Sequence, residues 1–319
     1  MNRLHGWTEY LVLALIWVGL ILLFGALSDN FLTTRTFTTL AGRVPTLTVI
    51  AAGMTLVLIV AGIDLSVGSV LGLSGATLGL ALTDWGWPLG AAALLCVAVG
   101  TLAGLVNGTL SVRLGIPSFI VTLGMLEAAR GGAYLVTNSQ TKYIGAAVEP
   151  LARPLPGIGL PLSFLIAILV VVIMHVVLTK TVFGRYLLAI GCNERALQYS
   201  GVNPRPYKVA VFVISGFLVG LGALFHTARL GSSDPNAGVG MELAAIAAVV
   251  IGGTSLMGGR GSVINSFLGV LIIATLEAGL AQIGATEPTK RVITGVVIVV
   301  AVAVDALRKR SRVARRQPS

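Results

Sequence analysis

The sequence predicts an all-α, polytopic membrane protein with about ten transmembrane helices. Of its 319 residues, 55% are hydrophobic and only 11% are charged, whereas a soluble globular chain is usually about 25% charged. The mean hydropathy is +0.94, and apolar runs follow one another along most of the chain. Forty glycines suit helices whose backbones approach closely in lipid. No polar stretch is long enough for a second folded domain, so we expect one membrane domain over residues 1–319.

Ten apolar segments are candidate spans. The first follows Arg3, and we read it as an uncleaved helix because a signal peptide has a shorter apolar core and a small-residue cleavage site. The two cysteines, Cys96 in an apolar run and Cys192 in a polar loop, suggest no disulfide framework. The predicted spans are residues 10–27, 45–61, 67–82, 89–112, 117–137, 160–179, 208–230, 242–256, 262–283 and 290–307.

The basic residues indicate that both ends of the chain face the cytoplasm. With that orientation, 14 of the 22 lysines and arginines lie on the inner side and 8 on the outer side. Six of them lie in a basic tail, residues 308–319, directly after the last apolar segment. This distribution is typical of a cytoplasmic membrane end, so the net charge of +10 does not indicate nucleic-acid binding. Trp85 and Trp87 suit the outer interface.

A polar stretch, Gly62 to Ser69, separates the second and third segments. It contains Asp64 and Ser66, and a carboxylate inside a bilayer costs roughly 2.5 kcal/mol or more unless it faces a cavity or a partner. Broken apolar segments of this kind are typical of transport sites. A plain turn in which Asp64 caps the next helix is the alternative, and both roles are compatible. If the two segments are re-entrant, Asp64 lies nearer the membrane midplane.

The longest inner loop, residues 180–207, contains a predicted short helix. Asn193 suits its N-cap, Glu194 its first turn and Gly201 the left-handed position beyond its end. Two helical turns are not stable alone in water, so this helix needs a docking partner. That partner is either the rest of the same chain or a cytosolic protein that receives an apolar face including Leu197 and Tyr199. The candidate contact residues are Gly191, Asn193, Glu194, Arg195, Leu197, Tyr199 and Gly201.

Four ordered motifs carry a resemblance to a known family. AGIDLSVGSV (residues 61–70) resembles the GGIDLSVGS signature of bacterial sugar permeases of the ribose-transporter type, which are membrane subunits of ATP-binding-cassette importers. FGRYLLAIGCNERA (183–196) is similar to the cytoplasmic coupling segment of that family. GMELAAIAAVVIGGTSLMGGRGS (240–262) and IPSFIVTLG (116–124), with Ala129-Arg-Gly, match further motifs. The resemblance covers about residues 40–305 and implies a type II-like importer permease fold.

The resemblance also implies partners and a location. It implies a bacterial inner membrane, a second permease copy or close paralogue, a cytosolic ATPase that binds ATP, and a periplasmic sugar-binding protein. This binding protein would meet Lys142, Arg153 and Asp234. A neutral sugar needs donors and acceptors along its path, and the spans and their ends offer Asp64, Ser66, Asn107, Ser118, Thr122, Arg130 and Glu242.

Several of these residues also have ordinary structural roles. Asn107 could make an interhelical hydrogen bond, and Glu242 could favour a helix N-terminus. Glu127 and Arg130 are three residues apart, so we hypothesise an ion pair between them that shapes the outer mouth. Glu127, Cys192 and Ala244 depart from the family pattern, and the departure at Ala244 could change the substrate or its polar contact.

Other classes of function are weaker. The chain has neither the Gly-x-x-x-x-Gly-Lys phosphate-binding loop nor His-Glu-x-x-His, so we expect no ATPase activity, no enzyme activity, no metal and no cofactor of its own. The main alternative is an ion-coupled secondary transporter that uses Asp64, Glu127 or Glu242. A branched-chain amino acid permease of a related branch is disfavoured by the motif at residues 61–70. The sequence does not specify the sugar.

Overall fold

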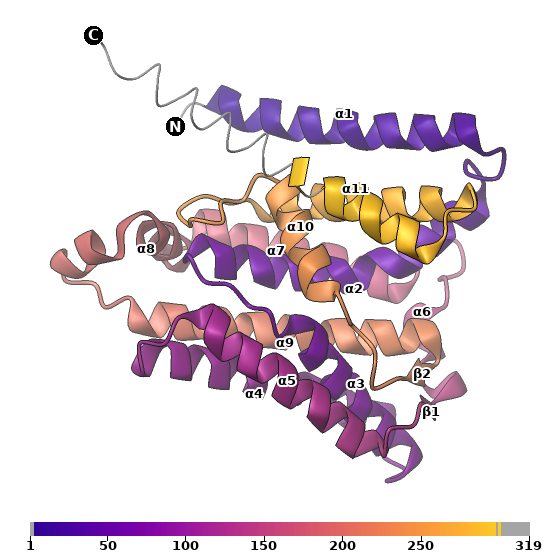
Figure 1. Ribbon diagram of the computed structural model, residues 1–319, viewed down its shortest axis with the longest axis horizontal. Helices are drawn as coiled ribbons and strands as arrows, with labels where there is room; N and C mark the ends of the chain where they lie inside the picture. Colours follow the sequence, from indigo (N-terminus) through magenta and orange to yellow (C-terminus); the bar gives the residue numbers. More distant parts are fainter. Residues whose placement is uncertain (1–2, 298, 301–319) are drawn as a thin grey trace.

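The computed structural model describes residues 3–297, 299 and 300, and over this range the chain is almost entirely helical (Figure 1). The only strands among these residues are two short ones that pair antiparallel, with Lys142 opposite Ser233. In chain order the elements are α1 (Arg3–Leu27), α2 (Thr34–Ile59), α3 (Val67–Thr83), α4 (Leu89–Arg113), α5 (Ser118–Thr137), β1 (Lys142–Tyr143), a 3-10 turn (Gly145–Ala147), α6 (Glu149–Ala152), α7 (Leu162–Lys180), α8 (Val182–Tyr199), α9 (Arg205–Leu230), β2 (Ser232–Ser233), α10 (Met241–Ile251) and α11 (Val263–Gln282).

The predicted polytopic helical class is confirmed, with differences in length. Within the described part, 7 helices are long and apolar enough to cross a membrane: α1, α2, α4, α5, α7, α9 and α11. The third and eighth predicted segments are the shorter apolar helices α3 and α10. Of the tenth segment, residues 290–297 are helical, whereas 298 and 301–307, like the basic tail 308–319, lie outside the described residues.

The predicted start of the second span was wrong. We expected it at Pro45, but α2 begins at Thr34 and runs through Pro45. The polar residues before Pro45 read as a loop, yet Thr38 and Thr39 donate their hydroxyls to carbonyls one turn back in the same helix, those of Thr34 and Arg35. Such back-bonding lets hydroxyl residues sit inside a helix.

Helix α2 lies in the middle of the protein and packs against α9, and glycines allow α4 to pack closely against α9 (Figure 1). Along α4, Gly100 and Gly104 recur every four residues and face Gly216 and Gly220 of α9. A Cβ atom at Gly104 would overlap the carbonyl of Phe212, and one at Gly216 would overlap the carbonyl of Gly100. Small residues at this spacing allow backbone-to-backbone packing in lipid, where no hydrophobic effect drives helices together.

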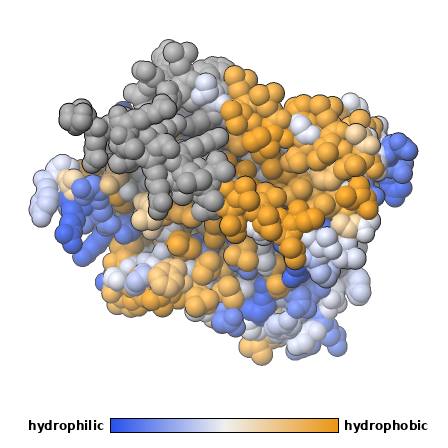
Figure 2. Space-filling model, turned by 45° about the horizontal axis from the view of Figure 1, so that its top comes forward, coloured by the Kyte–Doolittle hydropathy of each residue, from blue (hydrophilic) through white to orange (hydrophobic). Residues whose placement is uncertain are grey.

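The surface divides into an apolar band between two polar ends. In Figure 2 the hydrophobic surface lies over the helices, and hydrophilic surface gathers at the left and right. The left end holds α8, and the right end holds β1 and β2 (Figure 1). We call these the α8 end and the β end. The loops at 180–207 and 138–159 therefore lie at opposite ends, as expected.

Candidate functional site

The polar stretch after α2 is an extended segment that enters the helix bundle. Helix α2 ends at Ile59 at the α8 end, and α3 begins only at Val67. Ala61, in the left-handed region with φ of 58°, turns the chain, and the amide of Gly62 donates to the carbonyl of Val57. With 17 residues at 1.5 Å each, α3 is about 25 Å long, shorter than a hydrocarbon layer of about 30 Å. Because α3 ends at the β end and is too short to cross the bundle, its N-terminus lies inside the bundle and does not reach the surface at the α8 end.

Two hydroxyl groups of α5 satisfy the backbone of this segment. Ser118 Oγ accepts a hydrogen bond from the amide of Ile63 at 2.9 Å, and Thr122 Oγ1 accepts one from the amide of Leu65 at 3.1 Å. At membrane depth, an amide outside a helix needs such a partner, because no bulk water is present to supply one. Ser118 and Thr122, both predicted pathway residues, therefore stabilise the extended segment between α2 and α3 by hydrogen bonds from α5.

Asp64 and Asn107 complete the same network. The carboxylate of Asp64 is buried and accepts from the amide and the hydroxyl of Ser66 at 2.9 and 2.6 Å. Asn107 Nδ2 of α4 donates to the Ser66 hydroxyl at 2.9 Å. The other amide atom, Asn107 Oδ1, is buried and has no hydrogen-bond partner among the described residues. The structure thus brings five of the seven predicted pathway residues together, and it gives Asp64 a local turn-forming contact.

A second extended segment, residues 231–240, enters from the β end and meets the first. It leads to α10, which has 11 residues and is about 17 Å long. Gly238 of this segment packs against Gly68 in the first turn of α3. A Cβ atom at Gly68 would overlap both the Gly238 carbonyl and the Glu242 carboxylate. Glu242 lies in the first turn of α10 and accepts from the Gly240 amide at 3.2 Å. The N-terminal ends of α3 and α10 therefore meet inside the bundle (Figure 1).

The expected ion pair between Glu127 and Arg130 is not formed. Arg130 Nη1 instead donates to the carbonyls of Pro235 and Ala237, at 2.8 and 3.0 Å. One turn further along α5, Tyr134 donates its hydroxyl to Asn236. The two carbonyls belong to an extended backbone that offers its acceptors to the nearest cation, so Arg130 fixes the second segment to α5.

Glu127 is exposed in the middle of α5, away from this contact. Among the described residues it has no ion pair and no hydrogen-bond partner. A carboxylate that faces hydrocarbon at this depth costs roughly 2.5 kcal/mol or more.

At the β end, Lys142 forms an ion pair with Asp84 at 2.7 Å. The Lys142 ammonium, with the Thr83 hydroxyl, holds the pKa of the Asp84 carboxyl below its ordinary value. Of the other residues predicted to meet a binding protein, Arg153 is exposed, and Asp234 accepts from the amide of Asn236. The exposed rings of Trp85 and Trp87 lie 5.2 Å apart at the same end.

At the α8 end, helix α8 has a kink that creates the predicted short helix. Asn193 is non-helical, with φ of −163° and ψ of 95°, and its side chain accepts from the amide of Ala196 at 3.0 Å. The predicted N-cap is thus confirmed, and Gly201 has the expected left-handed conformation, with φ of 86°. The prediction missed that α8 begins at Val182, before the kink.

The short helix presents one face to the protein and one to its surroundings. Leu197 packs against the hydrophobic core, whereas Arg195 is exposed and Tyr199 is 91% exposed. Glu194 forms an ion pair with Lys208 of α9 at 3.1 Å. Sequence reasoning missed Lys208, as it missed Asp84 as the partner of Lys142, because neither pair follows a sequence spacing.

Gly191 joins this helix to the broken segment. A Cβ atom there would overlap the carbonyl of Ile59, the last residue of α2, and would also approach the amide of Gly259. The glycine pair Gly258-Gly259, within a motif noted in the sequence, turns the chain with φ of 83° and 73°.

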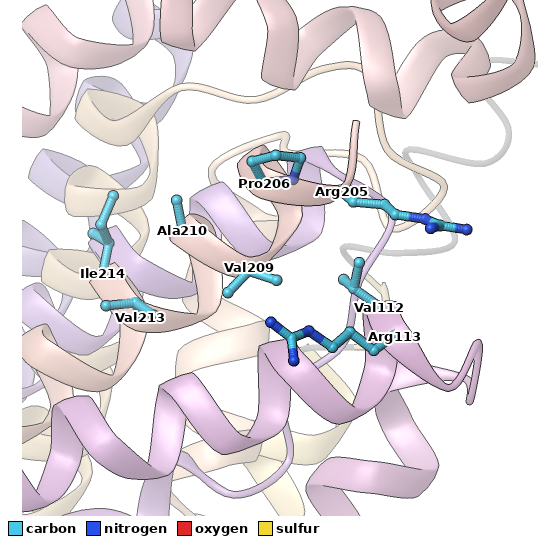
Figure 3. Close-up of a pocket in the computed structure, with 8 residues that line it drawn as sticks. All are labelled: Val112, Arg113, Arg205, Pro206, Val209, Ala210, Val213 and Ile214. Carbon is cyan, nitrogen blue, oxygen red and sulfur yellow. The ribbon is translucent and has the colours of Figure 1, made fainter. Parts of the chain in front are cut away.

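A cavity of about 660 Å³ lies between the ends of α4 and α9 (Figure 3). The side chains of Arg113 and Arg205 lie at its rim, and Val209 and Val213 contribute to its apolar wall. It contains none of the predicted pathway residues. Among the described residues no group of three His, Cys, Asp or Glu side chains could hold a metal ion.

Membrane-length helices with two extended segments that meet inside the bundle are typical of membrane transport proteins. Residues 36–302 match the family described as the permease component of the branched-chain amino acid transport system. The chain belongs to this family of ATP-binding-cassette import permeases, and it is a permease component, not the catalytic subunit.

Individual relatives cover most of the chain. A ribose import permease protein of Haemophilus influenzae is 39% identical over 261 residues, 81% of this chain and 80% of that protein. The ribose import permease protein of Escherichia coli K12 is 36% identical over 295 residues, 90% of each chain. A fructose import permease protein of Rhizobium meliloti is 33% identical over 304 residues, 92% of this chain and 83% of that protein. No solved structure matches the chain significantly.

Proposed function

We propose that the chain is the transmembrane permease of an ATP-driven importer for a monosaccharide (a pentose, a hexose or a related furanose). Relatives at 33–39% identity are named for the import of ribose and fructose. The polar network around Asp64 supports this function, because its hydroxyl, amide and carboxylate groups suit a neutral, hydroxyl-rich substrate. Residues 1–319 then form one permease domain in a bacterial inner membrane, with both termini in the cytoplasm.

The observation that carries the proposal is the contact of Gly191 with Ile59. It connects α8, which bears the exposed helix after Asn193, to the residue directly before the extended segment. A cytosolic ATPase that moves this helix would therefore displace the base of the segment. Arg195 and Tyr199 form the exposed face offered to that ATPase, which would bind and hydrolyse ATP in place of this chain.

The opposite end receives substrate. Lys142, Arg153 and Asp234, with exposed Trp85 and Trp87, lie where a sugar-loaded periplasmic protein would dock. Contacts through such rim charges are sensitive to salt. Closure of the ATPase would then alternate access of the path between the two ends, with a second copy or close paralogue beside this chain.

Transport in proteoliposomes tests this function. The permease is reconstituted with its ATPase and its binding protein, and uptake of radiolabelled ribose, fructose and allose is measured. We expect uptake of at least one sugar to require ATP on the α8 side and to persist when the proton gradient is collapsed. Uptake by this chain alone that stops with the gradient would instead support a secondary transporter using Asp64, Glu127 or Glu242.

A further inference from the structure

Glu127 is a charged group of the bundle that the interactions described above do not explain. It lies in the middle of α5, on a face that also exposes Gly124, Gly131 and Leu135. A Cβ atom at Gly124 or Gly131 would meet nothing within 4 Å, so this face is open along the helix. Within the described part of the chain, no cation pairs with the Glu127 carboxylate.

The nearest cation along the helix is already engaged. Arg130 binds the carbonyls of Pro235 and Ala237, which keeps its Nη1 atom on the side of the second extended segment. An ionised carboxylate without a partner is unfavourable in hydrocarbon. A border with water or polar groups would remove this cost, although the other exposed side chains of the face are apolar.

The depth of Glu127 matches that of the second break. Along α3 the segment lies against Gly79 at Ser233 and against Gly68 at Gly238, so it runs from the β end toward the start of α3 and passes Arg130 of α5 on the way. On α5, Glu127 lies three residues before Arg130 in this direction, about 4.5 Å further along the helix axis. On the segment, the same direction leads to Gly238 and to the start of α10 at Met241.

We propose that Glu127 lines the aqueous substrate path and that its carboxylate accepts hydrogen bonds from the hydroxyl groups of the transported molecule. A carboxylate offers two acceptor oxygens and no donor, which suits adjacent hydroxyls of a polyhydroxylated, uncharged substrate. This inference rests on the proposed function and assigns a specificity-determining residue to it.

Thiol accessibility tests the position of Glu127 without any transport assay. In a Cys96→Ala, Cys192→Ser background, Glu127→Cys is compared with Leu169→Cys, at an exposed leucine on α7. Native-membrane vesicles are treated with a charged methanethiosulfonate reagent. We expect the thiol from Glu127→Cys to react at least about tenfold faster, because a thiol in hydrocarbon does not ionise. Equal rates would overturn the inference, even if sugar transport itself is established.

Uptake kinetics test the contact with substrate. In reconstituted importer at a saturating concentration of the sugar-loaded binding protein, Glu127→Leu should lower the maximal uptake rate about tenfold, because a charged acceptor for the delivered sugar is lost. Glu127→Gln, which retains one acceptor oxygen, should lower this rate less. An unchanged maximal rate in Glu127→Leu would overturn the substrate contact. Absence of ATP-driven uptake in the unmodified importer would count against the proposed function, and the labelling result would still report on the path.

Discussion

The backbone amide of Gly259 donates a hydrogen bond to the carbonyl of Ile59, 2.9 Å away. This bond joins the end of α2 to the turn after α10. The first extended segment, which follows α2, and helix α10 are therefore connected through backbone groups at the α8 end. Gly191 of α8 lies against the same two residues. A displacement of α8 therefore reaches both breaks through one small cluster of backbone groups.

Replacement of Gly191 by alanine should disrupt this cluster. The new methyl group would overlap the Ile59 carbonyl, and overpacking of this kind lowers the free energy of unfolding by about 1–3 kcal/mol. Thermal unfolding in detergent measures the effect. Gly42→Ala in α2 is the matched control, because nothing lies within 4 Å of its new Cβ atom. Equal unfolding temperatures for the two variants would contradict the packing described for Gly191.

Removal of the α5 hydroxyls should destabilise the first break. Thr122→Val keeps the shape of the side chain and leaves the amide of Leu65 unpaired, which costs about 1–3 kcal/mol. Ser118→Ala should act in the same way on Ile63. The control is Thr101→Val in α4, whose hydroxyl only returns to the Val97 carbonyl of its own helix. If the control lowered the unfolding temperature as much as Thr122→Val, the hydroxyls of α5 would have no special role.

The Asp84–Lys142 pair should give a pH dependence in the acid range. Because Lys142 lowers the pKa of Asp84 below 3.8, the pair stabilises the folded state above that value and loses its effect as pH falls through the lower, folded-state pKa. Lys142→Ala should therefore flatten the dependence of stability on pH below 3.8. Asp84→Lys combined with Lys142→Asp should restore most of the interaction at neutral pH. A dependence of stability on pH in Lys142→Ala that equals that of the unmodified protein would contradict the pairing.

Replacement of Gly68 should block the meeting of the two breaks. A methyl group there would overlap the Gly238 carbonyl and the Glu242 carboxylate, so Gly68→Ala should reduce ATP-driven uptake strongly. Gly42→Ala in α2 adds the same methyl group where nothing lies within 4 Å and should have a much smaller effect. Equal uptake by Gly68→Ala and the unmodified chain would show that the contact does not matter for transport.

Much of the fold follows from local sequence properties. Long apolar runs predict the spans because hydropathy is a property of each segment alone. The cap at Asn193 and the left-handed Gly201 also depend on neighbouring residues only, and the structure confirms both. The early start of α2 was missed because threonine hydroxyls can donate hydrogen bonds to backbone carbonyls of their own helix. A hydropathy scale does not include such bonds and counts these residues only as polar.

The contacts of the candidate site depend on distant parts of the chain. Arg130 was expected to pair with Glu127 one turn away, yet it binds carbonyls more than 100 residues further along. The segment 231–240 read as an ordinary outer loop, because its entry into the bundle is defined by glycines that fit other glycines. Asp64 stood out in sequence through its charge, whereas Asn107, which donates to the Ser66 hydroxyl, is one polar residue among many.

The central claim is that the helix after Asn193 binds an ATPase, and affinity purification from the native membrane tests it most directly. The baits are the unmodified chain, Tyr199→Glu and Tyr143→Glu; these two tyrosines are 91% and 82% exposed, at opposite ends. Loss of a buried tyrosine contact at an interface lowers affinity by about tenfold or more. We predict that a cytosolic ATPase co-purifies with the unmodified chain and with Tyr143→Glu but is lost with Tyr199→Glu. Recovery of no ATPase with any bait, or equal recovery with both variants, would contradict the account.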